Sequence, residues 1–548
     1  MKFQMKPLLS AMACLALMSG TANADSLLGD LLVSTSFYAG NSSTVSVGQT
    51  LALNSNGTAA TTAIANGSYP NVFNNNTVDG SFGVTSGIAL ETFNSANVQT
   101  GSLDLTAAAA AQGINLATSF SSKSELALNV STDGTAVTFM GYNAALNKLD
   151  ISNSNTAAVY DPSNPTNNIT SATARAIGKV NLSTGALQVT DVNAYSGNNG
   201  RAVVLANGNY YMVGNAGNSG KPKPANSVLD QLSANTGVQM LNPTTANQTG
   251  GAYNTTVVGK QVCPTCANTG SGNQYGFSIT QLGQTADKTG KDDNFRGETV
   301  FNNTLYVTKG SGGNGVNTVY QVGPVGALAN GGAIPSDATI TVLPGLNTTL
   351  ATTATSGPNP FGIWFANATT MYVADEGDGT AADAATSSFA GLQKWTFNGT
   401  TWVKDYTLTS GLNLGQNYTV TGGLNSDGSI NSNGTGYSYT TATDGLRNIT
   451  GKVNADGTVT IYAVTSTVSG SGDQGADPNK LVDITDSLGN TTLDTTETFN
   501  TVQTAAYGQV LRGVALTAPV PEADSYALML SGLGLVGFLA RRKKQTSK

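Results

Sequence analysis

The sequence predicts an all-β protein whose strands form a β-propeller of six or seven blades. Hydrophobic residues make up 39% of the chain and charged residues only 10%, while the 65 glycines indicate many turns. Hairpins of alternating apolar and polar residues recur along the chain, and further strand-like segments follow them. A strand-like segment near each end of the chain is typical of a propeller whose two termini share one blade.

The chain begins with a segment that is typical of secretion. A basic start precedes an apolar run at 8–18, and Ala22 and Ala24 form the small-x-small pattern that signal peptidase accepts. We therefore interpret residues 1–24 as a signal peptide that engages the Sec machinery and signal peptidase. The mature protein would begin at Asp25.

Five segments carry the hairpin pattern that predicts the inner part of each blade. In each, an apolar strand is joined to a second alternating strand across a turn of Gly, Asn or Asp. These segments are residues 125–140, 201–213, 296–307, 361–373 and 447–464. Candidate outer strands are residues 317–322, 392–397, 402–406 and 480–485. Four strands per unit are typical of a propeller blade.

The two ends of the exported region predict how the ring closes. Residues 511–516 resemble an inner strand, and residues 31–38 resemble the strand that should follow it. Pairing them in one blade would close the ring and remove open sheet edges. This gives a propeller-like extracellular domain over 25–518, with room for a degenerate seventh blade between residues 40 and 120. The alternative fold is a β-solenoid or a series of β-sandwiches.

Cysteine placement indicates an oxidising exterior. Removal of the signal peptide leaves Cys263 and Cys266, which lie in a loop rich in Gly, Asn and Thr. A local disulfide between them is the expected state of such a pair outside the cell. A redox motif would need a strand-then-helix context, and a zinc site would need more ligands in a chain with no His.

The charge balance excludes nucleic acid as a partner. Seven of the 25 Lys and Arg residues lie in the two terminal targeting segments, which leaves 18 against 32 Asp and Glu. Nucleic-acid phosphates bind to basic patches, whereas the rest of the chain has more acidic than basic residues. This balance fits an exterior protein that meets cations.

Four arginines share one position of the repeat, at the start of a predicted inner strand. They are Arg201, Arg296, Arg447 and Arg512. In a propeller this position faces the mouth of the central channel, where guanidinium groups would bind carboxylated sugars through bidentate contacts. The structural alternative is that each arginine pairs with a neighbouring acid such as Asp293, Glu298 or Asp444, or bonds to strand-end carbonyls.

An acidic loop provides candidate metal ligands. Asp375, Glu376, Asp378 and Asp383 follow a predicted strand and are interspersed with glycines. Hard carboxylate oxygens at close spacing are the ligands that Ca²⁺ prefers, which makes Ca²⁺ the candidate cofactor. The alternative is an exposed acidic turn. A second, weaker set comprises Asp473, Asp477 and Asp483.

The composition restricts catalysis. Because the chain has no His, Ser-His-Asp catalysis and imidazole-ligated metal sites are excluded. A glycosidase or lyase that uses paired carboxylates stays open, although the spacing assigns no pair. The glycine-rich residues 310–315 lack the Lys-Ser/Thr of a phosphate-binding loop.

The tail at 519–548 combines three ordered features. Pro521 and Glu522 come first, an apolar run at 526–540 follows, and a basic cluster ends it. The cluster is Arg541, Arg542, Lys543 and Lys544. The apolar run is shorter than the roughly 20 residues that span a bilayer, so it would rely on an interfacial Tyr526 and snorkelling cations. The positive charges place the C-terminus inside and the preceding chain outside.

This order of features resembles the PEP-CTERM sorting signal of Gram-negative bacteria, with Ala523 where the family has Pro. The resemblance implies a Sec signal peptide, transient anchoring in the inner membrane and cleavage near Pro521 and Glu522 by an exosortase-like enzyme. Members of this class are read as surface, biofilm or exopolysaccharide-matrix proteins.

The sequence therefore predicts a secreted protein, sorted to the cell surface or the extracellular matrix, whose propeller binds or scaffolds exopolysaccharide. We expect binding rather than catalysis. The alternative function is an extracellular polysaccharide hydrolase or lyase with Asp or Glu in the propeller channel.

Overall fold

The computed structural model describes residues 26–38, 85–120, 122–146, 148, 173–216, 235–259, 279–280, 293–310, 315–351, 356–421, 438–469, 477–506 and 508–518. In this part of the chain nearly all regular structure is β-strand. Its helices are short: α1 (Leu105–Ala110), the 3-10 helix η2 (Ala329–Gly331) and α3 (Ala381–Ala384). The all-β prediction is confirmed.

The described strands form six sheets, which we call blades 1 to 6 in chain order. Blade 1 contains β29 (Gln509–Leu516), β1 (Leu31–Phe37), β2 (Thr85–Phe93) and β3 (Gln99–Asp104), with β4 (Thr118–Ser119) paired to β2. Blade 2 contains β5 (Asn129–Val130), β6 (Ala136–Tyr142), β7 (Arg175–Asn181), β8 (Leu187–Asn193), β13 (Ala252–Asn254) and β12 (Gln248–Thr249). Blade 3 contains β9 (Gly200–Ala206), β10 (Asn209–Gly214), β11 (Gln239–Leu241) and β14 (Thr256–Val257).

The second half of the chain supplies the other three blades. Blade 4 contains β16 (Glu298–Phe301), β17 (Thr304–Lys309), β18 (Thr318–Val322), β19 (Ile340–Val342) and β15 (Ile279–Thr280). Blade 5 contains β20 (Pro360–Asn367), β21 (Thr370–Asp375), β22 (Gly391–Phe397) and β23 (Trp402–Leu408). Blade 6 contains β25 (Ser438–Val453), β26 (Thr458–Ser469), β27 (Lys480–Ser487) and β28 (Asn500–Thr504), with β24 (Asn417–Thr421) paired to β25.

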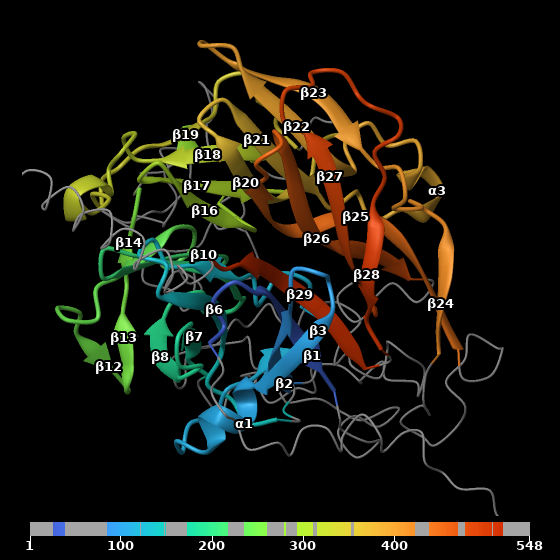
Figure 1. Cartoon of the computed structure of the whole chain (residues 1–548). Coiled ribbons are helices and arrows are strands. Elements are labelled where there is room, and N and C mark those ends of the chain that lie inside the picture. The colour runs from blue at the N-terminus through green and yellow to red at the C-terminus, as the bar shows by residue number, and fades with distance from the viewer. Residues whose placement is uncertain are drawn as a thin grey trace, which may run out of the picture.

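One strand of each blade lies innermost, and together these strands form a closed ring. β29, β5, β9, β16, β20 and β25 each contact the innermost strands of the two neighbouring blades. Figure 1 shows the blades following one another around this ring in chain order. The predicted hairpins coincide with the first two strands of blades 2 to 6. The six-bladed, propeller-like arrangement is confirmed, and residues 85–120, where a seventh blade could have been, supply β2, β3 and β4 of blade 1.

The two ends of the described chain meet in blade 1, as the sequence predicts. β1 pairs with β29 in antiparallel register, with Leu31 opposite Leu516 and Phe37 opposite Gln509. Beyond the strand, Thr517 donates its N–H to the Asp30 carbonyl at 3.0 Å. The blade whose innermost strand comes from the C-terminus therefore closes the ring without an open inner edge.

Asn-rich turns set the register of two inner hairpins. Asn207 and Gly208 connect β9 to β10 with φ values of 52° and 76°, and Asn302 and Asn303 connect β16 to β17 with φ values of 46° and 58°. Two consecutive positive φ values define the type I′ turn, whose twist matches that of antiparallel strands. The turn residues thus fix which face of each strand is buried.

Hydroxyl groups join neighbouring blades at the same point of the ring. Thr308 of β17 accepts the Gly297 N–H at 2.9 Å and donates to the Phe361 carbonyl of blade 5 at 2.5 Å. Ser34 of β1 makes the equivalent bridge from Gly513 to the Leu126 carbonyl of blade 2. Glycine is needed here because a Cβ on Gly297 would lie 2.3 Å from the Phe361 oxygen.

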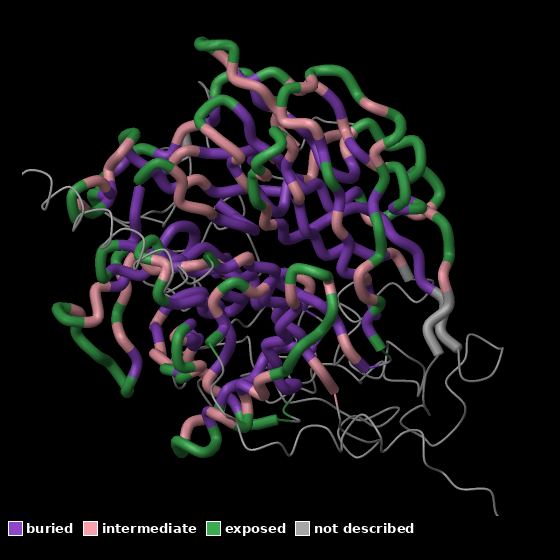
Figure 2. The backbone as a smooth tube through the Cα atoms, viewed as in Figure 1, coloured by how far each residue is buried: buried purple, intermediate pink, exposed green. Residues whose placement is uncertain are grey.

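The core consists of the apolar faces between adjacent blades, and Figure 2 shows buried residues around the axis and exposed ones at the periphery. Between blades 5 and 6 this core contains an ion pair, with Lys394 Nζ 2.9 Å from Asp486 Oδ2 and both side chains fully buried. Tyr406 donates to Asp486 Oδ1 at 2.7 Å and accepts from Lys394 Nζ at 3.0 Å. The pair is therefore fully enclosed by hydrogen-bonding partners.

Replacing Lys394 by Met should destabilise the protein by about 3–5 kcal/mol, because it leaves the Asp486 carboxylate buried without a cation. Urea unfolding at neutral pH measures the difference. Lys452→Met, at an exposed position of β25, is the matched control and should cost much less. Equal effects of the two substitutions would contradict the assigned role of the buried pair.

Candidate functional site

The four arginines of the repeat lie at one end of the axis and are buried. Arg201, Arg296, Arg447 and Arg512 have 3%, 7%, 4% and 3% of their surface exposed. In blades 5 and 2 the equivalent ring positions are held by Phe361 and Leu126, whose carbonyls meet Gly297 and Gly513 of the preceding blade. We call the side chains of the four arginines the arginine layer.

A segment that comes before β5 crosses the arginine layer. We call residues 120 and 122–126 the axial segment. Arg512 donates to the carbonyls of Phe120, at 2.5 Å, and of Ser122, and Arg296 donates to the Ser124 hydroxyl. The segment ends at Leu126, a non-glycine residue with φ of 65°. Backbone and hydroxyl oxygens of one loop thus occupy the guanidinium groups of two blades.

Arg201 bonds to a different partner. Its Nη1 donates to the Asn294 side chain and to the Phe295 carbonyl, the latter at 2.7 Å. Asn294 and Phe295 directly precede Arg296 in the chain. This contact therefore joins the arginine-layer positions of blades 3 and 4.

Glu376 is the carboxylate at the centre of this end of the axis. Its Oε1 lies 3.2 Å from Lys123 Nζ and its Oε2 lies 3.2 Å from Arg447 Nε. Burial alone would raise the pKa of Glu376, but Lys123, Arg447 and Arg296 outweigh it and lower the pKa to about 2. One acid from the loop after β21 therefore links the axial segment to blades 4 and 6.

Sequence reasoning did not find Lys123, Glu125 or Arg175. Glu125 accepts from Thr118 Oγ1 at 2.5 Å and from Tyr142 Oη at 2.7 Å. Arg175 is completely buried with its guanidinium 5.4 Å from the centre of the Tyr142 ring, and burial lowers its pKa to about 10. Lys123 and Glu125 lie outside the strands and Arg175 begins β7, so no repeat position marks them.

Glu376→Gln should destabilise the protein at pH 7 by about 3–5 kcal/mol, since it leaves the cations around it without a carboxylate. The folded pKa of about 2 lies below the ordinary value of 4.5. The stabilisation is therefore complete above pH 4.5 and is lost as the pH falls toward 2. Urea unfolding should show the same difference from the wild type at pH 7 and pH 5, and a smaller one at pH 3.5.

Asp337→Asn is the control for this series, because Asp337 is exposed in the loop before β19. It should follow the wild type at neutral pH. A Glu376→Gln variant as stable as the wild type at pH 7 would show that Glu376 does not hold the arginine layer together.

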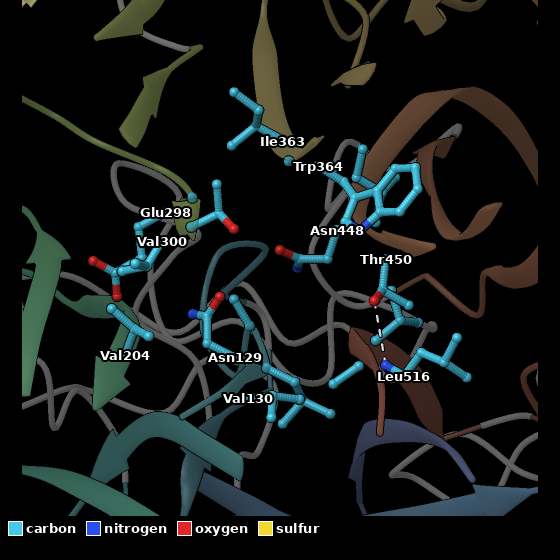
Figure 3. Close-up of a pocket in the computed structure, with 18 of the residues that line it drawn as sticks. Asn129, Val130, Val204, Glu298, Val300, Ile363, Trp364, Asn448, Thr450 and Leu516 are labelled. Carbon is cyan, nitrogen blue, oxygen red and sulfur yellow. Dashed lines mark hydrogen bonds between the residues drawn. The ribbon is translucent and has the colours of Figure 1, made fainter. Parts of the chain in front are cut away.

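A channel continues from the arginine layer along the inner strands. Its cavity has a volume of about 290 Å³ and is lined by strands of all six blades. In blades 4, 5 and 6 the lining begins next to the ring position described above, at Gly297, Gly362 and Asn448. Figure 3 shows Asn129, Asn448 and Thr450 among the lining side chains. Most of the lining is polar backbone and amide or hydroxyl groups. The channel can therefore bind a small polar ligand.

The lining residues also hold the ring together. Asn448 Nδ2 donates to the Arg512 carbonyl at 2.8 Å, and Asn129 Nδ2 donates to the Val203 carbonyl at 3.2 Å. The Leu516 N–H donates to Thr450 Oγ1 at 3.2 Å, drawn as a dashed line in Figure 3. Each bond crosses from one blade to the next, so the channel wall is held in place by these cross-links.

Glu298 is a buried acid between blades 3 and 4. It is 6% exposed, and neither carboxylate oxygen has a hydrogen-bond partner within the described part of the chain. In Figure 3 its carboxylate lies toward Val204 of β9. Burial raises the pKa of Glu298 well above its ordinary value of 4.5.

Glu298→Gln should raise the melting temperature at pH 8 and leave it nearly unchanged at pH 4. A folded pKa above the unfolded value means that the stabilisation is complete below pH 4.5 and is lost as the pH rises through the folded pKa. Gln carries no charge at any pH and escapes this loss. If the melting temperatures of the two proteins fall by the same amount between pH 4 and pH 8, this assignment is wrong.

The acidic side chains of residues 375–383 point in two directions. Glu376 faces the axis, while Asp375, Asp378 and Asp383 line a separate pocket between blades 4 and 5. Asp375 is fully buried and accepts the Asn359 N–H at 2.7 Å, and Asp378 accepts the Thr380 N–H at 2.9 Å. No three His, Cys, Asp or Glu side chains among the described residues are placed to hold a metal ion. The calcium hypothesis gains no support from this geometry.

The other predicted positions are placed as follows. Asp477 accepts from Thr441 Oγ1 and Asp483 accepts from Asn97 Nδ2, each at 3.2 Å, so both serve internal contacts. Asp473 lies outside the described residues. So do the predicted signal peptide with Ala22 and Ala24, Cys263, Cys266, and the tail with Pro521, Glu522, Arg541, Arg542, Lys543 and Lys544.

Comparison with known families bears on the tail. Residues 519–544 match the family model described as the PEP-CTERM protein-sorting motif. The tail is a PEP-CTERM sorting signal. This confirms the resemblance seen in the sequence and implies export to the cell envelope or surface of a Gram-negative bacterium, with processing by an exosortase.

The matched residues lie in the tail and do not include the propeller. No curated protein matches the chain. Among the helices of the described residues, none has the length and apolar character needed to cross a bilayer, and the predicted helix at 526–540 lies outside them. The PEP-CTERM signal therefore indicates where the protein is sent, and the propeller must indicate what it does.

Proposed function

We propose that the protein is sorted to the cell surface or the exopolysaccharide matrix, where its propeller acts as a binding and scaffolding module for polysaccharide. The observation that carries this proposal is the position of ring closure. β29 ends at Leu516, Thr517 is bonded to Asp30, and the sorting motif begins at residue 519. Cleavage near Pro521 and Glu522 would thus leave every described blade intact.

The channel supports a binding role. It is closed at one end by the arginine layer and the axial segment, and its wall presents amide, hydroxyl and backbone groups to a cavity of about 290 Å³. Such groups bind sugar hydroxyls through paired hydrogen bonds, and a wall built on strands from six blades is preorganised.

The arginine layer gives the closed end of this channel a positive character. Since the guanidinium groups lie beneath the axial segment, they would attract a carboxylated sugar through their field, and direct bidentate contact would require residues 122–124 to move aside. We therefore place the anionic part of a bound glycan toward this floor.

One observation favours the alternative of a polysaccharide hydrolase or lyase. Burial raises the pKa of both Asp375 and Asp444 to about 7, which is the range of a carboxylic general acid. Asp375 nevertheless accepts three N–H groups, from Asn359, Gly377 and Gln393. This bonding fits a structural carboxylate better than a proton donor, which places the binding role first.

Binding is tested by co-sedimentation of the mature protein with the exopolysaccharide of the producing bacterium. We expect the wild type to pellet with the polymer and Thr299→Phe, which places a bulky ring in the channel wall, to bind at least tenfold more weakly. Thr400→Phe, at an exposed position, is the control.

The same incubation separates binding from catalysis. Steady release of reducing ends or unsaturated sugars, abolished in Asp375→Asn, would overturn the binding role in favour of the enzyme. Failure of the folded wild type to pellet with the polymer would overturn the proposal altogether.

A further inference from the structure

The pocket lined by Asp375, Asp378 and Asp383 is a second concave site, separate from the channel. Its volume is about 430 Å³. The loop after β19, the segment before β20 and the loop after β21 form its walls, so it lies between blades 4 and 5 at the arginine-bearing end. A cavity of this size is in the range of small-molecule sites, roughly 300–1,000 Å³.

One side of the pocket is polar, and part of its hydrogen-bonding capacity is uncommitted. Asp378 uses one carboxylate oxygen for the Thr380 N–H. Asp383 is exposed, and in the described part of the chain its carboxylate accepts no hydrogen bond. Ser356, Thr386 and Ser388 add hydroxyl groups to the same wall. These groups suit a ligand that presents several hydroxyls.

The pocket also has an apolar part. Phe389 lines the pocket and also a smaller adjoining cavity of about 90 Å³, whose walls include Val319, Leu346 and Trp395. Lys404 Nζ lies 5.3 Å from the centre of the Phe389 ring and donates to the Ser388 carbonyl at 3.0 Å. The cation therefore holds the ring in one position at the edge of the pocket.

An aromatic ring that lines the same pocket as carboxylate and hydroxyl groups suits the two faces of a pyranose. The C–H face of the sugar packs on the ring, and its equatorial hydroxyls donate to carboxylate oxygens. The negative charge of the wall disfavours uronic acids, and the failure of the three carboxylates to converge disfavours a metal ion.

We propose that this inter-blade pocket binds a neutral hexopyranose residue, with Asp383 accepting its hydroxyl hydrogens and Phe389 packing against its apolar face. The inference deepens the proposed function and rests on it, because it adds a glycan subsite outside the channel. A polymer held at both sites would be bound more tightly than at either one.

Isothermal titration of the mature protein with neutral hexasaccharides of glucose in different linkages tests the pocket, and oligogalacturonate is the anionic comparison. We expect at least one neutral hexasaccharide to bind, and the binding of oligogalacturonate, which the channel attracts, to be unchanged by substitutions in the pocket. Asp383→Ala and Phe389→Ala should each weaken neutral binding at least tenfold. Asp337→Ala, at an exposed aspartate before β19, should leave it unchanged.

Melting temperatures identify any variant that fails to fold. If Phe389→Ala fails to fold, the affinity of Asp383→Ala alone tests the pocket. Equal affinity of Asp383→Ala and wild type would overturn the pocket, as would the absence of binding by every neutral hexasaccharide. Neither result changes the sedimentation of the wild type or Thr299→Phe with the exopolysaccharide. Titration therefore tests the pocket and sedimentation tests the proposed function, so the two failures are distinguishable.

Discussion

The antiparallel pairing of β1 with β29 is the contact on which the rest of the ring depends. It joins residues that are more than 470 positions apart, such as Arg512 and Ser36. Through Ser34 the same pair positions the Leu126 carbonyl of blade 2, and through Leu511 and Val514 it packs on Val464 and Leu481 of blade 6. Both neighbours of blade 1 would lose a partner surface without it. Contacts of such long range form late in folding, so the ring gains its cooperativity only when the chain is complete.

The arginine layer shows how a nearly uncharged chain uses its few cations. Burying a guanidinium is costly unless its N–H groups are bonded. Arg512 bonds to carbonyls of the axial segment, Arg201 bonds through Nη1 to the chain just before Arg296, and Arg447 bonds to Glu376. Each arginine thereby bonds to a segment outside its own blade. The layer therefore specifies how neighbouring blades and the axial segment sit relative to one another, and it closes one end of the channel.

Local signals explain what could be predicted from the sequence. Asn-Gly and Asn-Asn turns flanked by alternating apolar residues determine their hairpins over a few residues, and the repeat of these hairpins gave the blades. The common position of the four arginines followed from the same repeat. Their burial did not, because the partners are loops far away in the chain, with Lys123 and Glu376 separated by 253 positions. The acidic loop was treated as one ligand set, whereas Asp375 and Glu376 face different directions, as successive residues of extended backbone do.

One strand contributes to both the ring closure and the channel wall. Leu516 is the last residue of β29, pairs with Leu31 across blade 1, and also lines the channel cavity. Its N–H is bonded to Thr450, so the channel wall and the ring seam are the same hydrogen-bonded structure. Changes inside β29 must therefore alter both the stability of the ring and the shape of the channel. The last described contacts of the ring are made by Thr517, and the sorting motif begins at residue 519. The sorting motif therefore follows the strand that closes the ring by only a few residues.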